Sequence, residues 1–331
     1  MNEAIHIFMG SMNIVGKSGV GKAVLHQKEH LAHQGINANA KGFFGSDIIH
    51  FNTVFPDSLI AAFVARLIGK KVIYYGHTTM EDFKNSFKGS NLVAPLFKQW
   101  IRLCYKQAHV IITPTEYSKS LLDSYNLKRP VVALSNGIDL DYWGRDNNDR
   151  AHFRAKYNIS QDAKVVVSVG HYIERKGIIE FVELAKAMPD VEFYWFGYTN
   201  LALVPSQIAD AIKSAPENLK FPGYITSEEL REAYHGSDAF CFMSHEETEG
   251  IVVLEALASG TPTIVRDIGV YDGWLFDGKN ALKCNDNHEF KSALEHVLTS
   301  DCKSLTEGGL ATARERSYDA IGAKLLTIYN M

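Results

Sequence analysis

The sequence has 331 residues, of which 46% are hydrophobic and 22% charged. This is the composition of a soluble globular protein, and the length is sufficient for two ordinary domains. No apolar run reaches the roughly 18 residues of a membrane span, and the N-terminus lacks the basic segment of a secretory signal, so we expect a cytoplasmic protein. The four cysteines are far apart in the sequence, which argues against disulfides and a zinc site.

The net charge of −4 conceals two halves of opposite charge. Residues 1–156 contain 19 basic and 12 acidic residues, giving +7, whereas residues 157–331 contain 15 basic and 26 acidic residues, giving −11. A basic half on an otherwise acidic chain indicates that the first half meets an anionic partner.

The chain begins with a predicted strand at residues 4–9, a glycine-rich loop, and a predicted helix at residues 23–33 that ends at Gly35. Residues 16–23 nearly match the phosphate loop of P-loop NTPases. However, Ala23 stands where a Ser or Thr would bind Mg²⁺, and six residues separate Gly16 from the strand. A P-loop-like nucleotide-binding protein is therefore a remote alternative, and an ordinary flexible loop is another.

Short apolar runs at residues 47–51, 71–75 and 110–113 are separated by helical stretches, which predicts a parallel sheet with crossovers. Ligands of such sheets gather at the carboxyl ends of the strands, where His50 and His77 lie. A single histidine at a strand end is more often structural than ligand-binding, so both interpretations stay open on this evidence.

A cationic amphipathic helix is predicted at residues 91–106, beginning loosely at Pro95. Lys98, Arg102 and Lys106 recur at every fourth position, and Trp100 lies among the apolar residues of this segment. Such a helix either rests on an anionic membrane surface or covers the sheet while its lysines reach into solvent.

The middle of the chain contains one pattern that could suggest a metal site. Asp139 and Asp141 form an Asp-x-Asp pair, but they follow a turn instead of ending an apolar strand, so we predict no metal site there. The polar residues 145–150 then mark a linker.

A second strand–helix pattern starts at residues 165–169 and continues with a loop, residues 170–177, and a helix from Ile178. This loop contains His171, Arg175 and Lys176. Cations at the mouth of a strand-to-helix loop suit a diphosphate ligand.

A polar loop at residues 243–250 leads into a predicted helix at residues 251–258, which Gly260 and Pro262 terminate. Gly250 lies at the helix N-terminus, where free backbone N–H groups favour an anion such as phosphate. Glu247 and Glu255 flank this turn with seven residues between them. They would accept hydrogen bonds from sugar hydroxyls, the alternative being a solvated acidic surface.

This stretch resembles the Glu-x7-Glu signature of retaining glycosyltransferases of family 4, which have the GT-B fold. The resemblance implies an α/β protein with two Rossmann-like domains facing each other across a cleft. It implies an acceptor-binding domain at residues 1–155, a nucleotide-sugar domain at 156–308, and a C-terminal helix, 309–331, that crosses back to the first domain. It further implies a UDP-sugar as co-substrate, with neither a metal nor another cofactor. The chain departs from the family at residues 248–249, Thr-Glu, where members often have Gly-Phe.

The roles of family residues carry over to matching positions. His77 and Glu247 are the expected catalytic residues, which face the donor sugar, and Glu255 is expected to hold the ribose. Lys176, with either Arg175 or His171, would contact the diphosphate. The remaining donor contacts are expected from a glycine-rich loop, from the start of the 251–258 helix and from a loop that clasps the base, namely Ser18, Gly19, Val20, Gly250, Ile251, Val252, Tyr224 and Ile225.

Residues 76–83 and 87–91 also resemble bacterial enzymes that add a second hexose to monoglycosyldiacylglycerol. The predicted reaction is transfer from UDP-glucose or UDP-galactose to a glycolipid such as monoglucosyldiacylglycerol, for membrane glycolipids and lipoteichoic acid anchors. Lys98, Trp100, Arg102 and Lys106 are expected to face an anionic membrane and to hold the enzyme peripherally at its inner side. No nucleic-acid partner is expected. The alternative is a soluble sugar or polysaccharide acceptor.

Overall fold

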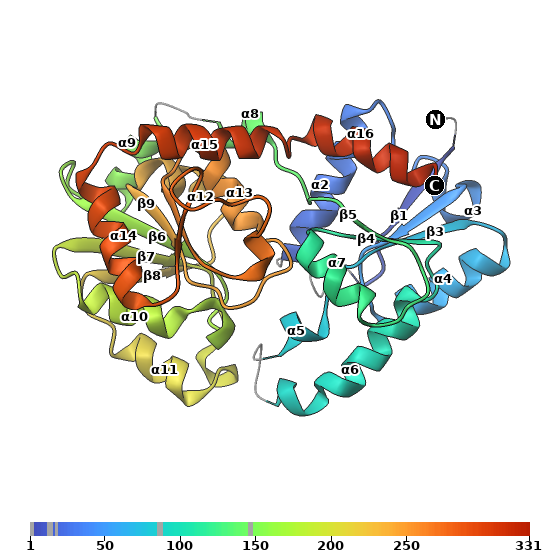
Figure 1. Cartoon of the computed structure of the whole chain (residues 1–331), viewed down its shortest axis with the longest axis horizontal. Coiled ribbons are helices and arrows are strands. Elements are labelled where there is room, and N and C mark those ends of the chain that lie inside the picture. Colours follow the sequence, from blue (N-terminus) through green and yellow to red (C-terminus); the bar gives the residue numbers. More distant parts are fainter. Residues whose placement is uncertain (1–2, 12–15, 17–18, 85–88, 145–147) are drawn as a thin grey trace. The chain divides into compact units, whose positions relative to one another are not determined.

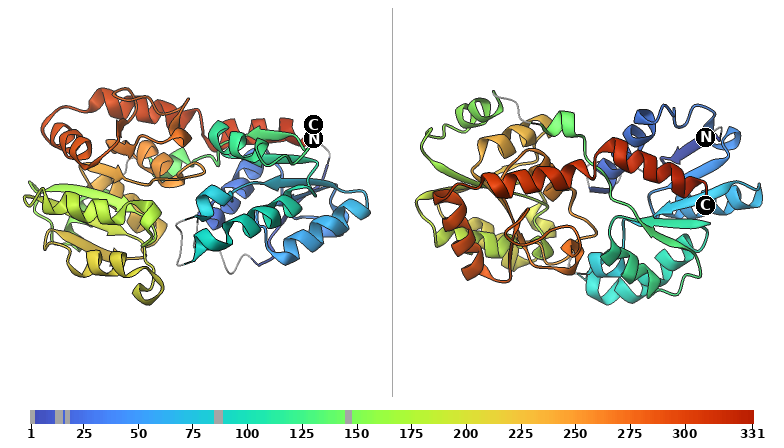
Figure 2. Two further views of the ribbon diagram at one scale, coloured as in Figure 1. Left: turned by 60° about the horizontal axis from the view of Figure 1, so that its bottom comes forward. Right: turned by 45° about the horizontal axis from the view of Figure 1, so that its top comes forward.

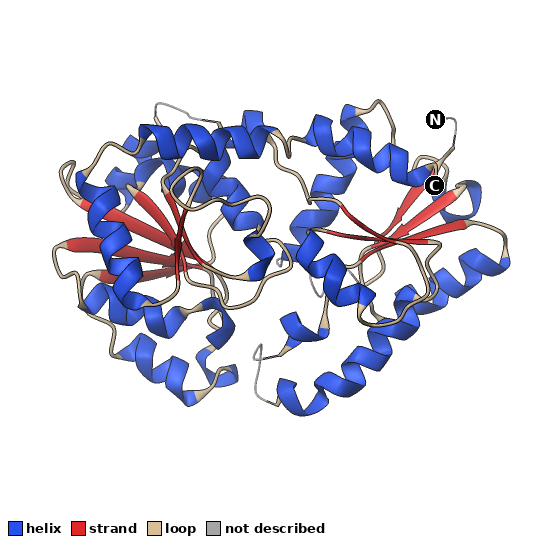
Figure 3. Ribbon diagram, in the orientation of Figure 1, coloured by secondary structure: helices blue, strands red, loops and turns tan. Residues whose placement is uncertain are grey.

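The computed structural model describes residues 3–11, 16, 19–84, 89–144 and 148–331. The chain forms two compact units (Figure 3). Unit 1 comprises Met1–Lys84, Asn91–Asp139 and Arg316–Met331, and unit 2 is made mainly of Leu140–Glu315. The chain passes into unit 2 earlier than the expected boundary at residue 155, because helix α9 (Asp149–Lys156) packs on α12 (Ser227–Gly236) of that unit.

The sheet of unit 1 is parallel throughout and follows the order of its strands in the chain. Its strands are β1 (Ile5–Phe8), β2 (Ile48–Phe51), β3 (Lys71–Tyr75), β4 (Val110–Thr113) and β5 (Val131–Ala133). The helices are α2 (Gly19–His33), α3 (Gly42–Gly45), α4 (Pro56–Leu67), α5 (Met80–Phe83), α6 (Ser90–Tyr105), α7 (Glu116–Asp123) and α16 (Tyr318–Tyr329).

Successive side chains along each strand of unit 1 point to opposite faces of the sheet, so that each face carries an apolar layer. In β3, Val72 and Tyr74 pack with α4 and α6, whereas Ile73 and Tyr75 pack with α2 and α16. Helices α2 and α16, from opposite ends of the chain, lie side by side on the second face (Figure 1; Figure 2).

The sheet of unit 2 has the order β11-β10-β9-β6-β7-β8 and is also parallel. Its strands are β6 (Lys164–Val169), β7 (Val191–Phe196), β8 (Leu219–Gly223), β9 (Ala239–Phe242), β10 (Thr263–Arg266) and β11 (Leu282–Cys284). The longer helices besides α9 and α12 are α10 (Ile178–Lys186), α11 (Ser206–Lys213), α13 (Ile251–Ala258), α14 (Asn287–Thr299) and α15 (Lys303–Arg314); short helical turns lie at α8 (Leu140–Trp143), η1 (Glu174–Lys176), η2 (Leu201–Leu203) and η3 (Gly269–Tyr271). The strand order reverses between β6 and β9, which is the doubly wound Rossmann arrangement.

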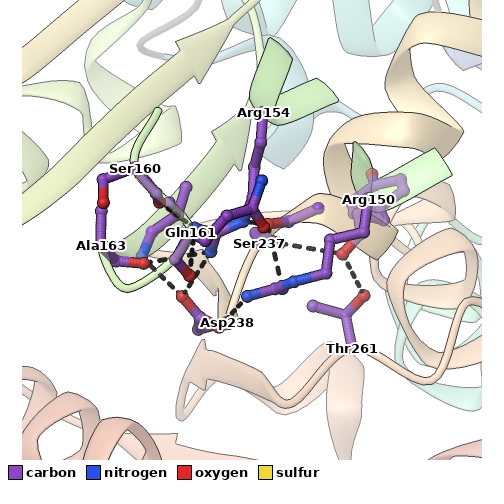
Figure 4. Close-up of polar contacts among 11 residues, drawn as sticks. Arg150, Arg154, Ser160, Gln161, Ala163, Ser237, Asp238 and Thr261 are labelled. Atoms are coloured by element: carbon purple, nitrogen blue, oxygen red, sulfur yellow. Dashed lines mark hydrogen bonds and ion pairs between the residues drawn. The ribbon is translucent and has the colours of Figure 1, made fainter. Parts of the chain in front are cut away.

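A buried arginine fastens the start of unit 2 to its sheet (Figure 4). The Arg154 side chain of α9 is fully buried and donates to the carbonyl oxygens of Gly236, Ser160, Gln161 and Ala163 at 2.6–3.2 Å. It also pairs with Asp238 at 3.2 Å. The guanidinium is therefore satisfied on all sides, which offsets the cost of burying its charge.

The C-terminal tail differs from the expected single helix. Helix α15 ends at Arg314 in unit 2, and α16 starts at Tyr318 in unit 1, because Ser317 caps α16 by accepting from the N–H of Ala320 at 3.3 Å. The residues between the helices pair with Ile138, whose N–H donates to the Arg316 carbonyl at 2.9 Å. In the described part of the chain, no helix has the length and apolar character to cross a membrane.

Candidate active site

The predicted donor-binding residues of unit 2 gather where the strand order of its sheet reverses. Strands β6 and β9 are neighbours although more than 60 residues separate them in the chain, and their carboxyl ends lead into residues 170–177 and 243–250. Crevices at such reversals are the usual ligand sites of open parallel sheets. The strand order alone therefore brings Arg175 and Lys176 to Glu247 and Gly250.

Backbone contacts lock the two loops together. The carbonyl of Arg175 accepts from the N–H of His245 at 2.7 Å and from the hydroxyl of Ser244 at 3.1 Å. Gly177 has a φ of +75°, and a Cβ there would lie 2.4 Å from the Met243 carbonyl oxygen, so only glycine fits this crossing. The conformation of each loop is fixed by the other.

Lys176 and Glu247 form a largely buried ion pair at this crossing. Arg175 Nη1 lies 3.7 Å from the same Glu247 oxygen and donates to the Glu246 carbonyl at 2.6 Å. Burial raises the pKa of Glu247, but the charges of Lys176 and Arg175 outweigh burial and hold it below its usual value. The carboxylate is therefore ionised at neutral pH, and both cations lie beside it.

His171 and Arg175, the two candidates for the diphosphate contact, lie at different places in the structure. His171 is exposed, and its Nδ1 lies 3.0 Å from the Tyr198 carbonyl oxygen, whereas Arg175 lies with Lys176 and Glu247. Of the two candidates, Arg175 is therefore the one at the crossing of the two loops, and its contact with a diphosphate stays a prediction.

Helix α13 starts at this crossing. Gly250 precedes it with a φ of +86°, and a Cβ there would lie 3.3 Å from the hydroxyl of Tyr271. Ile251 and Val252, which form its first turn, are half-buried. The first N–H groups of a helix have no partner within it, so this end suits an anion.

Glu255 lies inside α13 and is fully buried. It accepts a hydrogen bond from the Tyr234 hydroxyl at 3.1 Å, and the same hydroxyl lies 3.2 Å from the Val252 carbonyl oxygen. The alternative of a solvated Glu255 is therefore wrong, since the carboxylate is held within the unit by a tyrosine from α12, and the predicted ribose contact stays a prediction.

Two tyrosines at this site gave no signal in the sequence. Tyr234 lies in an ordinary amphipathic helix and Tyr271 in a short turn after β10, and neither pattern distinguishes a site residue. Tyr271 is fully buried, and its hydroxyl has no hydrogen-bond partner among the residues that the structure describes. The pair predicted to clasp the base lies elsewhere in unit 2, on the loop after β8, where Tyr224 is exposed and Ile225 half-buried.

In unit 1, His77 follows β3 and is 7% exposed. Its Nε2 lies 2.9 Å from Asn52 Oδ1, and its ring stacks on that of Tyr75 with centres 4.2 Å apart. Burial lowers the pKa of His77 to about 3, so the ring is neutral at physiological pH. His50 is fully buried and bonded to Gln27 and Tyr329, as expected of a structural residue.

The glycine-rich loop is described only in part. Ser18 lies outside the described residues, Gly19 begins α2, and Val20 is half-buried in its first turn. A Cβ built on Gly19 would meet no atom of the described residues within 4 Å.

Helix α6 matches the predicted range 91–106 to within one residue at each end, but it differs from the prediction in orientation. It includes Pro95 in its interior instead of starting there. Trp100 donates to the Val54 carbonyl at 2.6 Å, and Lys98 Nζ lies 4.2 Å from the centre of the Tyr125 ring. These two residues therefore point into unit 1, contrary to the expected membrane-facing orientation, while Arg102 is half-buried and Lys106 exposed.

The solvent side of α6 is instead an apolar stripe. Leu92, Leu96 and Leu103 are 85%, 74% and 48% exposed. Helix α4, which covers the same face of the sheet, exposes further apolar side chains, namely Ile60, Phe63 and Leu67. Arg66 of α4 donates to the Lys106 carbonyl at 3.1 Å and so ties the ends of the two helices together.

No group of three or more histidine, cysteine, aspartate or glutamate side chains is placed to hold a metal ion in the ranges that the structure describes. Asp139 precedes α8, and Asp141 lies within it. The metal independence of the reaction stays a prediction.

Comparison with known proteins identifies the two halves separately. Residues 30–142 match the family model described as Glycosyltransferase Family 4, and residues 149–309 match the one described as Glycosyl transferases group 1. The chain is similar to a processive diacylglycerol alpha-glucosyltransferase of Acholeplasma laidlawii, with 39% identity over 98% of this chain and 96% of that protein. It is 24% identical to an alpha-galactosylglucosyldiacylglycerol synthase of Streptococcus pneumoniae over 68% of this chain and 62% of that one.

Solved structures agree with this match in fold. Anabaena Alr3699/HepE in complex with UDP-glucose superposes with a TM-score of 0.73 and 16% identity, over 99% of this chain and 92% of that one. Sucrose-phosphate synthase from Thermosynechococcus elongatus gives 0.72 and 18% identity, over 87% of this chain and 74% of that one. The expected GT-B fold is confirmed.

Proposed function

Since the chain belongs to the family 4 glycosyltransferases, with the GT-B fold, we propose that it transfers a hexose from a UDP-sugar to a diacylglycerol-type glycolipid with retention of configuration. The donor is UDP-glucose or UDP-galactose, and the acceptor is a glycolipid such as monoglucosyldiacylglycerol. The product would serve membrane glycolipids and lipoteichoic acid anchors. The observation that carries this proposal is the 39% identity to a diacylglycerol glucosyltransferase along nearly the whole chain.

Electrostatic stabilisation of the leaving diphosphate is the main catalytic effect in this proposal. Breaking the bond between sugar and phosphate leaves negative charge on the diphosphate, and Lys176, Arg175 and the N-terminus of α13 supply positive charge at one point. Lys176 would exchange Glu247 for phosphate when the donor binds. Glu247 would then be released to accept a hydrogen bond from a hexose hydroxyl.

The other predicted residues hold the substrate. Glu255 would accept hydrogen bonds from the ribose hydroxyls, and Tyr224 and Ile225 would contact the base. His77, which is neutral, would contact the hexose through a hydrogen bond. We propose no divalent metal and no further cofactor, because the diphosphate charge is met by protein cations.

The apolar stripe on α4 and α6 supports a lipid acceptor. Leu92, Leu96, Ile60, Phe63 and Leu67 are each more than half exposed on a unit whose half of the chain carries a charge of +7. Apolar side chains buried at a membrane interface, with each nearby Lys or Arg adding about 1 kcal/mol, would give reversible peripheral binding. We propose that the protein rests with this surface on the inner face of the cell membrane.

The test is transfer from radiolabelled UDP-glucose and UDP-galactose to vesicles that contain phosphatidylglycerol and monoglucosyldiacylglycerol. We expect a diglycosylated lipid with an α-linkage, and co-sedimentation of the protein with the vesicles at low salt. Leu92→Ser with Leu96→Ser should weaken sedimentation, whereas Leu203→Ser, which changes a leucine of unit 2 that is 69% exposed, should not. Efficient transfer to a soluble sugar, without transfer to the lipid, would refute the proposed glycolipid acceptor.

A further inference from the structure

A continuous line of buried polar side chains runs through unit 1 from His77 to the last helix. Asn52, which follows β2, stands 2.9 Å from Nε2 of His77, and its amide nitrogen donates to Gln27 Oε1 at 2.8 Å. The amide nitrogen of Gln27, in α2, lies 2.5 Å from His50 Nδ1, which in turn lies 2.6 Å from the Tyr329 hydroxyl. All five residues are less than 9% exposed.

The orientation of the Gln27 and Asn52 amides decides which groups donate and which accept the hydrogen bonds along this line. The Gln27 amide nitrogen faces the ring nitrogens of His50 at 2.5 and 2.9 Å, so its oxygen is the end that accepts from Asn52. The side-chain oxygen of Asn52 therefore faces His77, and an amide oxygen can only accept a hydrogen bond. This orientation of the two amides requires the proton of the His77 ring on Nε2.

The other ring nitrogen of His77 is then a lone-pair acceptor. Nδ1 has no hydrogen-bond partner in the described ranges of the chain, and stacking on Tyr75, with an angle of 3° between the rings, fixes the ring plane. Burial lowers the pKa of His77 to about 3, so a second proton does not block Nδ1 at neutral pH.

We propose that Asn52 and Gln27 are positioning residues that hold His77 in its Nε2–H tautomer, so that Nδ1 accepts a hydrogen bond from a hydroxyl of the bound sugar. This inference rests on the proposed function. Asn52 and Gln27 need not touch substrate; they act through the ring. The alternative is a network that only satisfies buried polar groups, in which the Nδ1 of His77 has no role.

The tautomer is measured directly in the full-length protein. With histidine labelled with ¹⁵N in both ring positions, long-range ¹H–¹⁵N correlation spectra distinguish Nε2–H from Nδ1–H, and the His77 signals are those lost in His77→Gln. We expect Nε2–H in the wild type near neutral pH. A proton on Nδ1 would overturn the proposal, and this outcome is accessible even if no Asn52 variant folds.

Two substitutions at Asn52 separate positioning from packing. Asn52→Asp keeps the acceptor and adds a negative charge, so the titration of His77 should move up by roughly one to three pH units, and the acidic limb of the kcat/KM profile should move with it. Asn52→Leu removes the acceptor, so kcat should fall about 2- to 10-fold at nearly constant KM, with both tautomers in the spectrum.

The matched control is Asn39→Asp. It makes the same chemical change in unit 1, where, among the described residues, the Asn39 side chain bonds only the backbone of Ile7, at 2.6 and 3.0 Å. Asn39→Asp should show any loss of stability that this chemical change causes, but the titration of His77 should stay as in the wild type. The proposal fails if Asn52→Asp leaves the His77 titration unchanged, or if Asn39→Asp shifts it equally. If the spectra behave as expected but no UDP-sugar is used, it is the proposed function that fails.

Discussion

The ion pair between Lys176 and Glu247 leads to a prediction with two separable parts. Lys176→Met keeps most of the apolar stem but removes the ammonium group. It leaves Glu247, whose side chain is 8% exposed, with Arg175 at 3.7 Å as its remaining cation. Breaking a buried pair by removing one partner costs about 3–5 kcal/mol. Because Arg175 remains close, we expect unit 2 to lose stability near the lower end of that range, about 3 kcal/mol.

Glu247→Gln added to Lys176→Met should restore much of this stability, since the buried charge that lost its partner is then gone. The coupling between the two sites, measured by urea unfolding of both single variants and the double variant, should be about 1–3 kcal/mol. Equal stability of the single variant Lys176→Met and the wild type would contradict the pairing.

Ligand binding separates the roles of the two residues. Lys176→Met should weaken UDP binding in calorimetry by roughly 10- to 150-fold, because a charge-assisted contact worth about 1.5–3 kcal/mol is lost. Glu247→Gln should bind UDP at least as well as the wild type, since Lys176 no longer has to leave its partner, yet both variants should lose transfer. Unchanged UDP affinity in Lys176→Met would refute the assignment of Lys176 to the diphosphate.

Three further predictions address the ribose, the metal and the histidines. Glu255→Ala should weaken UDP binding roughly 10- to 150-fold, and calorimetry that shows wild-type affinity would exclude a ribose contact. Transfer should continue at the full rate in excess chelator; a loss that Mg²⁺ or Mn²⁺ reverses would show that a metal is required. Burial lowers the pKa values of His30 and His77 to about 3, so the unfolded state binds their protons first as the pH falls. Unit 1 should therefore keep full stability above about pH 6.5 and lose about 1.4 kcal/mol per histidine per pH unit between about pH 6.5 and 3, with thermal unfolding of His30→Gln showing a smaller slope.

The sequence determined the elements whose signal is local. Continuous apolar runs predicted β3 and β4 at their observed bounds, because a strand covered on both faces is apolar at every position. Gly250 and Gly260 marked the two ends of α13. The family motif, which depends on fixed spacing within one loop and helix, predicted the fold, which is confirmed, and the donor-site residues of that segment, which stay a prediction.

Three short strands and the break in the C-terminal tail were not predicted. Strands β5, β10 and β11 have three or four residues each, and the tail could be read as one helix because pairing with Ile138 interrupts it. The outward side of α6 was also misjudged. Trp100 turns inward because the Val54 carbonyl offers its indole a hydrogen bond, and Lys98 because Tyr125 offers a ring, neither of which is visible in the helix's own sequence.

The site itself needed the tertiary structure. Strand order places β6 beside β9, and only this brings Lys176 to Glu247, 71 residues later in the chain. The same holds for Tyr234 against Glu255, and for the line from His77 to Tyr329, which joins β2, α2 and the C-terminal helix. A sequence specifies which side chains are available at each position, but burial, pairing and the direction of a hydrogen bond depend on neighbours that only the folded chain brings together.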